Sequence, residues 1–256
     1  MALTNPPWPL VTLSGGVVGA LMGAFGVGGS SVATPILSLL GVPGLAAVAS
    51  PLPAVMPAAV LAAGPYARSG DVRPRAAAYS LLGAIPATIA GAILSRVVGG
   101  PLLLLISGVV LVIVGVRVLF PIEDAAREAG ERRRRNRPLL VGASAVVGLF
   151  TGLLANGGGF LLMPLYLLMF GLRMRRAVGT SLVVIAILSL PTLITHWALG
   201  HIDWAVALPF AAGLLPASFV GARLAGRFSK GAQRRAFGCF LVGFGVFFTL
   251  YRLLRG

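Results

Sequence analysis

A glycine-rich stretch occurs twice in this chain, and this duplication limits the fold more than any other feature. Residues 19–35 read GALMGAFGVGGSSVATP, and residues 148–164, at an offset of 129, read GLFTGLLANGGGFLLMP. The coinciding residues are Gly19 and Gly148, Gly23 and Gly152, Gly28 and Gly157, Gly29 and Gly158, and Pro35 and Pro164. Further matches continue at an offset of 130, from Ala47 and Ala177 to Gly115 and Gly245. The sequence is therefore a tandem duplication.

The composition is that of a protein embedded in a membrane. Charged residues make up 11% of the chain, against about 25% in soluble domains, and the mean hydropathy is +0.96. Apolar runs of about twenty residues recur along the chain, which predicts an all-α polytopic membrane protein. The net charge is +15. Its basic residues lie between the apolar runs, as in cytoplasmic loops, so we expect no nucleic-acid partner.

The first apolar run predicts a broken helix. It extends over 32 residues, from Leu10 to Gly41, and as one helix it would be roughly 48 Å long against a hydrocarbon core of about 30 Å. A helix that breaks at the glycines of residues 26–31 and leaves on the side where it entered fits better. Such backbone is tolerated at membrane depth only where protein or a watery cavity surrounds it. The run from Leu139 to Phe170 repeats this plan, with its break at Asn156–Gly159.

Each broken segment is followed by full membrane spans. They are expected near Ala46–Pro65, Ala76–Leu94, Leu102–Phe120, Ala177–Leu199, Ala205–Leu224 and Ala236–Leu253. Residues 1–120 and 139–256 are then two transmembrane repeats of one integral membrane domain. Residues 121–138 form a charged linker, interpreted as a cytoplasmic loop, with contact to anionic lipid as the alternative.

The positive charges favour the re-entrant interpretation of the broken segments. If all eight segments crossed the membrane, the two sides would hold 12 and 9 of the 21 Lys and Arg residues. If the broken segments are re-entrant, one side holds 18 and the other 3. The positive-inside rule selects the second arrangement, with both termini outside and the linker in the cytoplasm. Three full spans per half is an odd number, so we expect two inverted repeats, each with one broken re-entrant helix pair plus three full spans.

Inverted repeats with discontinuous helices are typical of secondary transporters. A helix that begins inside the membrane has free N–H groups and a partial positive charge at its first turn, and glycine lets a ligand approach these amides. Two such starts predict a neutral pocket of donors for an anion. The candidate residues are Gly28, Gly29, Ser30, Ser31, Asn156, Gly157, Gly158 and Gly159 at the breaks, and Ser50, Thr180 and Ser181 early in the following spans. The glycines at positions 15, 19, 23, 148 and 152 are instead expected to serve close helix packing.

Other chemistry finds little support in the sequence. Acidic residues are absent from every expected span, so a carboxylate relay or a sodium cage is not indicated. His196 is the first candidate for proton coupling, with an interfacial role as the simpler interpretation; Tyr66 takes the equivalent place in the first half. The single cysteine, Cys239, is expected to be a packing residue. No metal site and no cofactor is predicted.

The repeated motif resembles a known family. Two copies of G-x3-G-x4-G-G-x5-P, each followed by a small-residue Ser/Thr step at Ser50 and at Thr180-Ser181, resemble the sulfite exporter TauE/SafE family of membrane transporters. The resemblance implies export or uptake of small sulfur-containing anions, such as sulfite, sulfonates or sulfoacetate, across a bacterial or archaeal inner membrane. This chain departs from the commoner pattern at Ser30, Asn156 and Pro51, which leaves the identity of the anion open.

Two other functions are compatible with a membrane protein of this layout. A passive anion channel would have the same sequence features. An intramembrane enzyme acting on a lipid phosphate is disfavoured because it would need a general base or a nucleophile with charged ligands in the membrane. We therefore expect a transporter rather than an enzyme, in contact with membrane lipid. The direction of transport, the coupling ion and the formation of a homodimer remain open.

Overall fold

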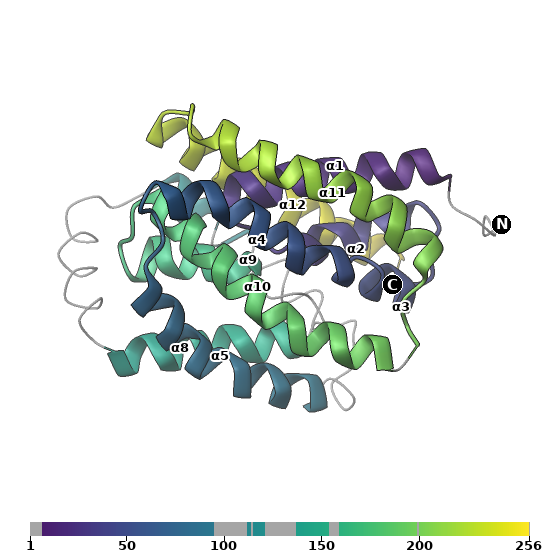
Figure 1. The fold of residues 1–256 in the computed structure, drawn as a ribbon, viewed down its shortest axis with the longest axis horizontal. Helices are drawn as coiled ribbons and strands as arrows, with labels where there is room; N and C mark the ends of the chain where they lie inside the picture. Colours follow the sequence, from purple (N-terminus) through teal and green to yellow (C-terminus); the bar gives the residue numbers. More distant parts are fainter. Residues whose placement is uncertain are drawn as a thin grey trace.

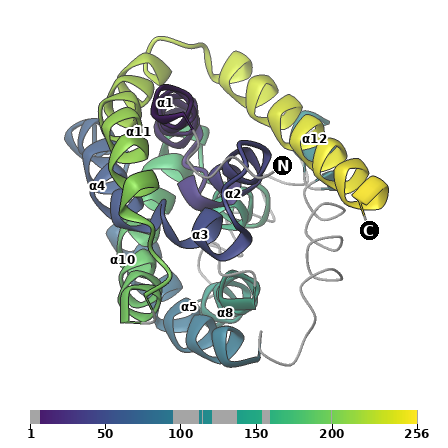
Figure 2. The same cartoon turned by 90° about the vertical axis from the view of Figure 1, so that its right-hand side faces the viewer.

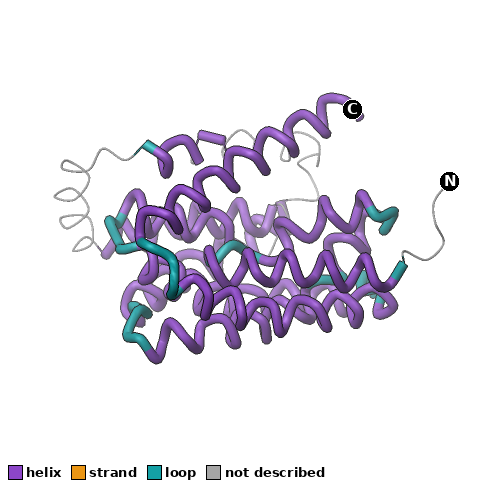
Figure 3. The backbone as a smooth tube through the Cα atoms, turned by 90° about the horizontal axis from the view of Figure 1, so that it is seen from above, coloured by secondary structure: helices purple, strands orange, loops and turns teal. Residues whose placement is uncertain are grey.

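A computed structural model describes residues 7–94, 112–113, 115–120, 137–153, 159–198 and 200–255. All regular structure in these residues is helical (Figure 3). The first half contains α1 (Trp8–Phe25), α2 (Gly29–Leu39), α3 (Gly44–Ala49), α4 (Leu52–Arg68) and α5 (Pro74–Leu94). The second contains α8 (Arg137–Leu153), α9 (Gly159–Pro164), a π-helix (Leu165–Met169), α10 (Met174–Ala198), α11 (Trp204–Ala225) and α12 (Lys230–Arg255), as Figure 1 shows. Most of the span expected at 102–120, the linker at 121–136 and the second break at 154–158 lie outside the described residues.

The helices confirm a polytopic membrane protein. Four of them are long and apolar enough to cross a membrane, judged on the described residues. They are Trp8–Phe25, Met174–Ala198, Trp204–Ala225 and the stretch Ala46–Arg68, which covers the end of α3 and all of α4. The observed bounds of α5, α10 and α11 lie within a few residues of the expected spans.

The first break lies where the glycines predicted it, but the two limbs are unequal. Helix α1 has 18 residues and is about 27 Å long, nearly the thickness of the hydrocarbon core. Helix α2 has only 11 residues. The first limb of the broken segment is therefore long enough to cross by itself, and the second is the short one.

The two halves interlock through glycine contacts. Helix α1 packs along α11, and α8 packs along α5 (Figures 1 and 2). A Cβ atom on Gly15, Gly19 or Gly23 of α1 would overlap a backbone carbonyl oxygen of α11. Likewise, a Cβ on Gly148 of α8 would collide with the backbone of Ala84 on α5. Membrane helices approach closely where small residues face each other, so the packing role predicted for these four glycines is confirmed.

Equivalent contacts recur in the two halves at the offset of the sequence repeat. The backbone amide of Arg73 donates to Thr180 Oγ1 at 3.1 Å, and the amide of Asp203, 130 positions after Arg73, donates to Ser50 Oγ at 3.1 Å. Positive φ angles also recur at this offset. The glycines concerned are Gly41 and Gly171, with φ of 88° and 58°, and Gly70 and Gly200, with φ of 69° and 68°.

The contacts also give the directions of the helices. Residues of α1 and α11 advance together, because Gly15 faces Phe210 and Gly23 faces Ser218. These two helices therefore run in the same direction. By contrast, Tyr66 in the last turn of α4 contacts Gly179 near the start of α10. Helices α4 and α10 occupy equivalent places in the two halves and run in opposite directions.

Cys239 corrects one expectation from the sequence. Its side chain is exposed on α12, so it is not a packing residue inside this chain. The nearby Gly238 faces Leu119, and Gly115 faces Leu241 and Val242. The close contacts of α12 with the segment at 115–119 thus use glycines on both sides, whereas Cys239 points away.

Candidate functional site

The first break lies inside the protein. Every residue from Gly26 to Ala33 is buried, although residues 26–28 are not helical. Irregular backbone at membrane depth requires such enclosure, because lipid offers no hydrogen bonds to free amides and carbonyls. The first break is therefore enclosed by protein, as broken backbone inside a membrane requires.

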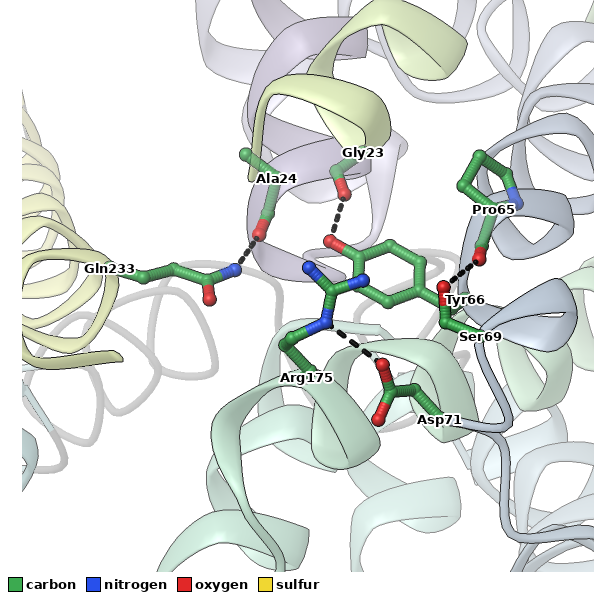
Figure 4. Close-up of polar contacts among 8 residues, drawn as sticks. All are labelled: Gly23, Ala24, Pro65, Tyr66, Ser69, Asp71, Arg175 and Gln233. Carbon is green, nitrogen blue, oxygen red and sulfur yellow. Dashed lines mark hydrogen bonds and ion pairs between the residues drawn. The ribbon is translucent and has the colours of Figure 1, made fainter. Parts of the chain in front are cut away.

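Side chains from three other helices bind the carbonyl groups at the end of α1. The last carbonyls of a helix have no partner within the helix. Tyr66 of α4 donates from its hydroxyl to the Gly23 carbonyl at 3.0 Å, and Gln233 of α12 donates from Nε2 to the Ala24 carbonyl at 2.8 Å (Figure 4). Ser181 of α10 donates to the Gly26 carbonyl at 3.2 Å and shares its hydroxyl with Val178 O at 2.9 Å. The predicted site residue Ser181 is therefore at the break.

The start of α2 presents hydrogen-bond donors, whereas the end of α1 presents acceptors. Gly28 is the N-cap residue, and no side chain caps this helix end. Ser31 in the first turn is 8% exposed, and its Oγ has no hydrogen-bond partner among the described residues. Leaving a buried hydroxyl unpaired costs about 1–3 kcal/mol. The helix start carries a partial positive charge, so this turn combines a positive end and an unpaired hydroxyl.

Some of the other residues predicted at the breaks are described in the structure, and some are not. Gly28, Gly29 and Ser30 are buried with Ser31 at the start of α2. Gly159 begins α9, and α9 contacts α2, so the helices that follow the two breaks touch. Asn156, Gly157 and Gly158 lie outside the described residues, and their part in a shared site stays a prediction.

Ser50 and Thr180 make their observed side-chain contacts with loop backbone, although Thr180 is next to Ser181 at the first break. Each is buried and accepts the loop amide described above, and Thr180 also donates to the Arg176 carbonyl at 2.6 Å. Because they lie at the starts of the antiparallel helices α4 and α10, they stand at opposite ends of the bundle. Their observed contacts hold the loops that precede α5 and α11.

A charged cluster beside the break was not anticipated from the sequence. Arg175 Nε lies 2.8 Å from Asp71 Oδ2, and the Arg175 guanidinium lies 5.4 Å from the centre of the Tyr66 ring (Figure 4). In the sequence, Arg175 lies between two apolar runs, where basic residues are typical of cytoplasmic loops. One signal was present: Asp71 is the only acidic residue in the first 120 positions. Its partner is 104 residues away and only the fold reveals it.

Two histidines face each other at the opposite end of the bundle. His196 Nδ1 and His201 Nδ1 are 3.3 Å apart. Trp197 and Trp204 next to them are 65% and 49% exposed, as expected of residues at a membrane interface. His196 and His201 stand 130 positions after Tyr66 and Asp71. The proton-coupling role of His196 stays a prediction.

Known proteins match nearly the whole chain. A family model described as sulfite exporter TauE/SafE matches residues 11–248. The chain belongs to the TauE/SafE family. A probable membrane transporter protein of Xylella fastidiosa (strain 9a5c) is 31% identical over 252 residues, which cover 93% of this chain and 94% of that protein.

Two Bacillus subtilis (strain 168) proteins also resemble this TauE/SafE chain. The probable membrane transporter protein YjnA is 25% identical over 86% of this chain and 91% of its own length. The probable membrane transporter protein YunE is 30% identical over 113 residues, or 40% of each chain. No solved structure matches the chain. The family and the relatives together make this protein a multi-pass membrane transporter.

Proposed function

We propose that this protein is a secondary transporter of small sulfur-containing anions, such as sulfite or organosulfonates, and works by alternating access around its glycine-rich breaks. The observation that carries the proposal is the buried start of α2, where Ser31 has an unpaired hydroxyl. An anion placed there would accept hydrogen bonds from Ser31 and from backbone amides, and the helix dipole would favour its charge. Neutral donors bind an anion without a fixed opposite charge, which favours its release.

The arrangement of the halves supports alternating access. Equivalent helices α4 and α10 are antiparallel, while equivalent loop contacts and turns recur in both halves. A second half that is inverted relative to the first accounts for both facts. In transporters with inverted repeats, the substrate lies where the two repeats meet. The contact between α2 and α9 supports such a meeting place for the two breaks.

The basic residues support an orientation in the inner membrane. Most of the described ones gather at the end of the bundle where α4 ends and α10 begins. They include Arg68, Arg73, Arg75, Arg173, Arg175, Arg176, Arg223, Arg227, Lys230, Arg234 and Arg235. Because cytoplasmic loops are enriched in Lys and Arg, we assign this end to the cytoplasm. Both termini then lie outside, and the opposite end, with His196 as the proposed proton-binding residue, faces outward.

A counterflow experiment in liposomes tests the function. Purified protein is reconstituted into vesicles loaded with unlabelled sulfite, sulfoacetate, taurine, sulfate or chloride, and entry of labelled sulfite is followed. A carrier predicts saturable entry that internal sulfite or a sulfonate accelerates. Entry that rises linearly with concentration and is indifferent to the internal anion would show a channel. If internal chloride and sulfate accelerated the entry of sulfite as much as internal sulfite or a sulfonate does, the proposed selectivity for sulfite and organosulfonates would be refuted.

A further inference from the structure

Arg175 lies directly beside the end of the broken helix α1. Its guanidinium lies over the Tyr66 ring, 5.4 Å from the ring centre, and the Tyr66 hydroxyl donates to the Gly23 carbonyl in the last turns of α1. Figure 4 shows the guanidinium in front of the ring, with its two terminal nitrogens on the side of Gly23 and Ala24. A cation near the negative end of a helix dipole is stabilised there. Arg175 thus lies beside the end of α1, at the basic end of the bundle.

The ion pair of Arg175 is incomplete and partly open to solvent. A guanidinium has five N–H donors and commonly binds a carboxylate through two of them. Here only Nε of Arg175 donates to the Asp71 carboxylate, and among the described residues no other side chain accepts a hydrogen bond from Arg175. The side chains of Arg175 and Asp71 are 29% and 19% exposed. Because both side chains reach solvent, an anion from solution can compete with Asp71 for the guanidinium.

The surrounding charge favours an anion as the exchange partner. Arg73 and Arg176 lie on the same two segments as the pair. Asp71 is the only acidic residue described at this end of the bundle. Clustered positive charge raises the local concentration of anions. The oxygen atoms of a sulfite or sulfonate group offer the same acceptors as the Asp71 carboxylate.

We propose that Arg175 is an oxyanion-binding residue at the basic mouth of the transporter, and that Asp71 is its internal counter-ion, which an incoming small oxyanion displaces. This inference rests on the proposed function, because it takes the displacing oxyanion to be the transported one. The exchange also has a structural consequence. Asp71 belongs to the first half and Arg175 to the second, so arrival of the anion releases a contact between the two halves.

Steady-state uptake kinetics of four variants test the proposal, with sulfite presented to the basic end. Arg175→Gln should raise the apparent KM about tenfold or more, the effect of losing one charge-assisted hydrogen bond. Arg175→Lys should fall between the wild type and Arg175→Gln, because an ammonium group lacks the planar fork. Asp71→Asn should lower the KM, since the competing carboxylate charge is gone. The control is Arg173→Gln, which removes an exposed charge two residues away and should change the KM less than about twofold.

The KM values of Asp71→Asn and Arg175→Gln should shift in opposite directions. This distinguishes ligand binding from a purely structural role of the ion pair. If the pair only braced the fold, Asp71→Asn and Arg175→Gln would lower the unfolding temperature together and move the KM alike or not at all. Either of these KM results would overturn the proposal. If wild type transports sulfite but Arg175→Gln has the same KM as Arg173→Gln, the inference fails while the transport function stands.

A binding measurement covers the case in which transport itself is absent. Thermal unfolding is followed with increasing sulfite, and with chloride at equal ionic strength. Sulfite should raise the unfolding temperature of wild type and Arg173→Gln, and clearly less that of Arg175→Gln. This result in a protein without flux would reject the transport proposal and retain the anion site. Equal rises in all three proteins would reject the site.

Discussion

The two ends of the helix bundle use the same backbone turn but carry different side chains. At the basic end, the Asp71 amide donates to the Tyr66 carbonyl at 2.8 Å, and at the other end the His201 amide donates to the His196 carbonyl at 3.1 Å. Gly70 and Gly200 turn the chain with nearly identical φ angles. Duplication has therefore conserved the geometry of both ends.

The chemistry of the two ends has diverged. At the basic end, Asp71 forms an ion pair with Arg175. Position 45, which is equivalent to 175, is a leucine, and the two histidines at that end face each other instead. One end thus holds a pair of opposite charges, and the other holds two imidazole rings. The two ends of the duplicated bundle therefore have the same backbone turn but different chemistry.

The largest effect is expected at the first break, which lies beside the basic end. Gly26 has φ of 65°, and a Cβ there would overlap Ser181 Oγ. Gly26→Ala therefore combines left-handed strain with overpacking, and we expect a loss of about 3 kcal/mol in the free energy of unfolding. Equilibrium unfolding in detergent measures this. Gly41→Ala, with φ of 88° and nothing near the added methyl, is the control and should lose about 1 kcal/mol.

Removing the Tyr66 hydroxyl tests the link between this end and α1. Tyr66→Phe leaves the Gly23 carbonyl without that partner, and the free energy of unfolding should fall by about 1–2 kcal/mol. Tyr166→Phe removes a comparable buried hydroxyl, which donates to Ser80 Oγ at 2.6 Å, and provides the matched control. Transport should decline only in Tyr66→Phe. A similar decline in both variants would contradict a special role for Tyr66.

The shared turn predicts equal behaviour at the two ends. Gly70 and Gly200 have matching φ angles, and each has open space where an added methyl group would lie. Each Gly→Ala change should therefore cost about 1 kcal/mol of unfolding free energy. The comparison is made by thermal unfolding of the two single variants. Costs that differ by more than about 1 kcal/mol would show that the turns are not equivalent.

The side chains of the two ends should respond differently to acid. Two imidazoles 3.3 Å apart repel each other when both carry a proton, so acid should destabilise this end of the folded bundle. Stability then falls as the pH falls, by less than about 1 kcal/mol at this partly exposed site. His201→Gln should abolish this dependence, whereas Asp71→Asn should leave it in place. Unfolding temperatures between pH 5 and 8 provide the readout.

The sequence predicted the features that depend on local pattern. Helix type, several span boundaries, the first break and the packing of Gly15, Gly19 and Gly23 all follow from hydropathy and glycine spacing. It did not predict the pairing of Asp71 with Arg175, because nothing in a sequence marks two loop charges as neighbours. The contacts of Ser50 and Thr180 with loop amides were not predicted, for the same reason. The hydroxyl of a small residue at a helix start can face a pocket or a loop, and only tertiary contacts decide which.

The most direct test of the anion site compares two buried hydroxyls that both lack partners among the described residues. Ser31 lies at the start of α2, and Ser144 lies in α8. Neither alanine variant should lose stability, because neither hydroxyl makes a hydrogen bond there. Unfolding temperature is measured against sulfite concentration, where saturation at a hundred times the Kd stabilises wild type by about 2.7 kcal/mol. We expect Ser144→Ala to match wild type and Ser31→Ala to need about tenfold more sulfite. Identical sulfite dependence in both variants would contradict the site.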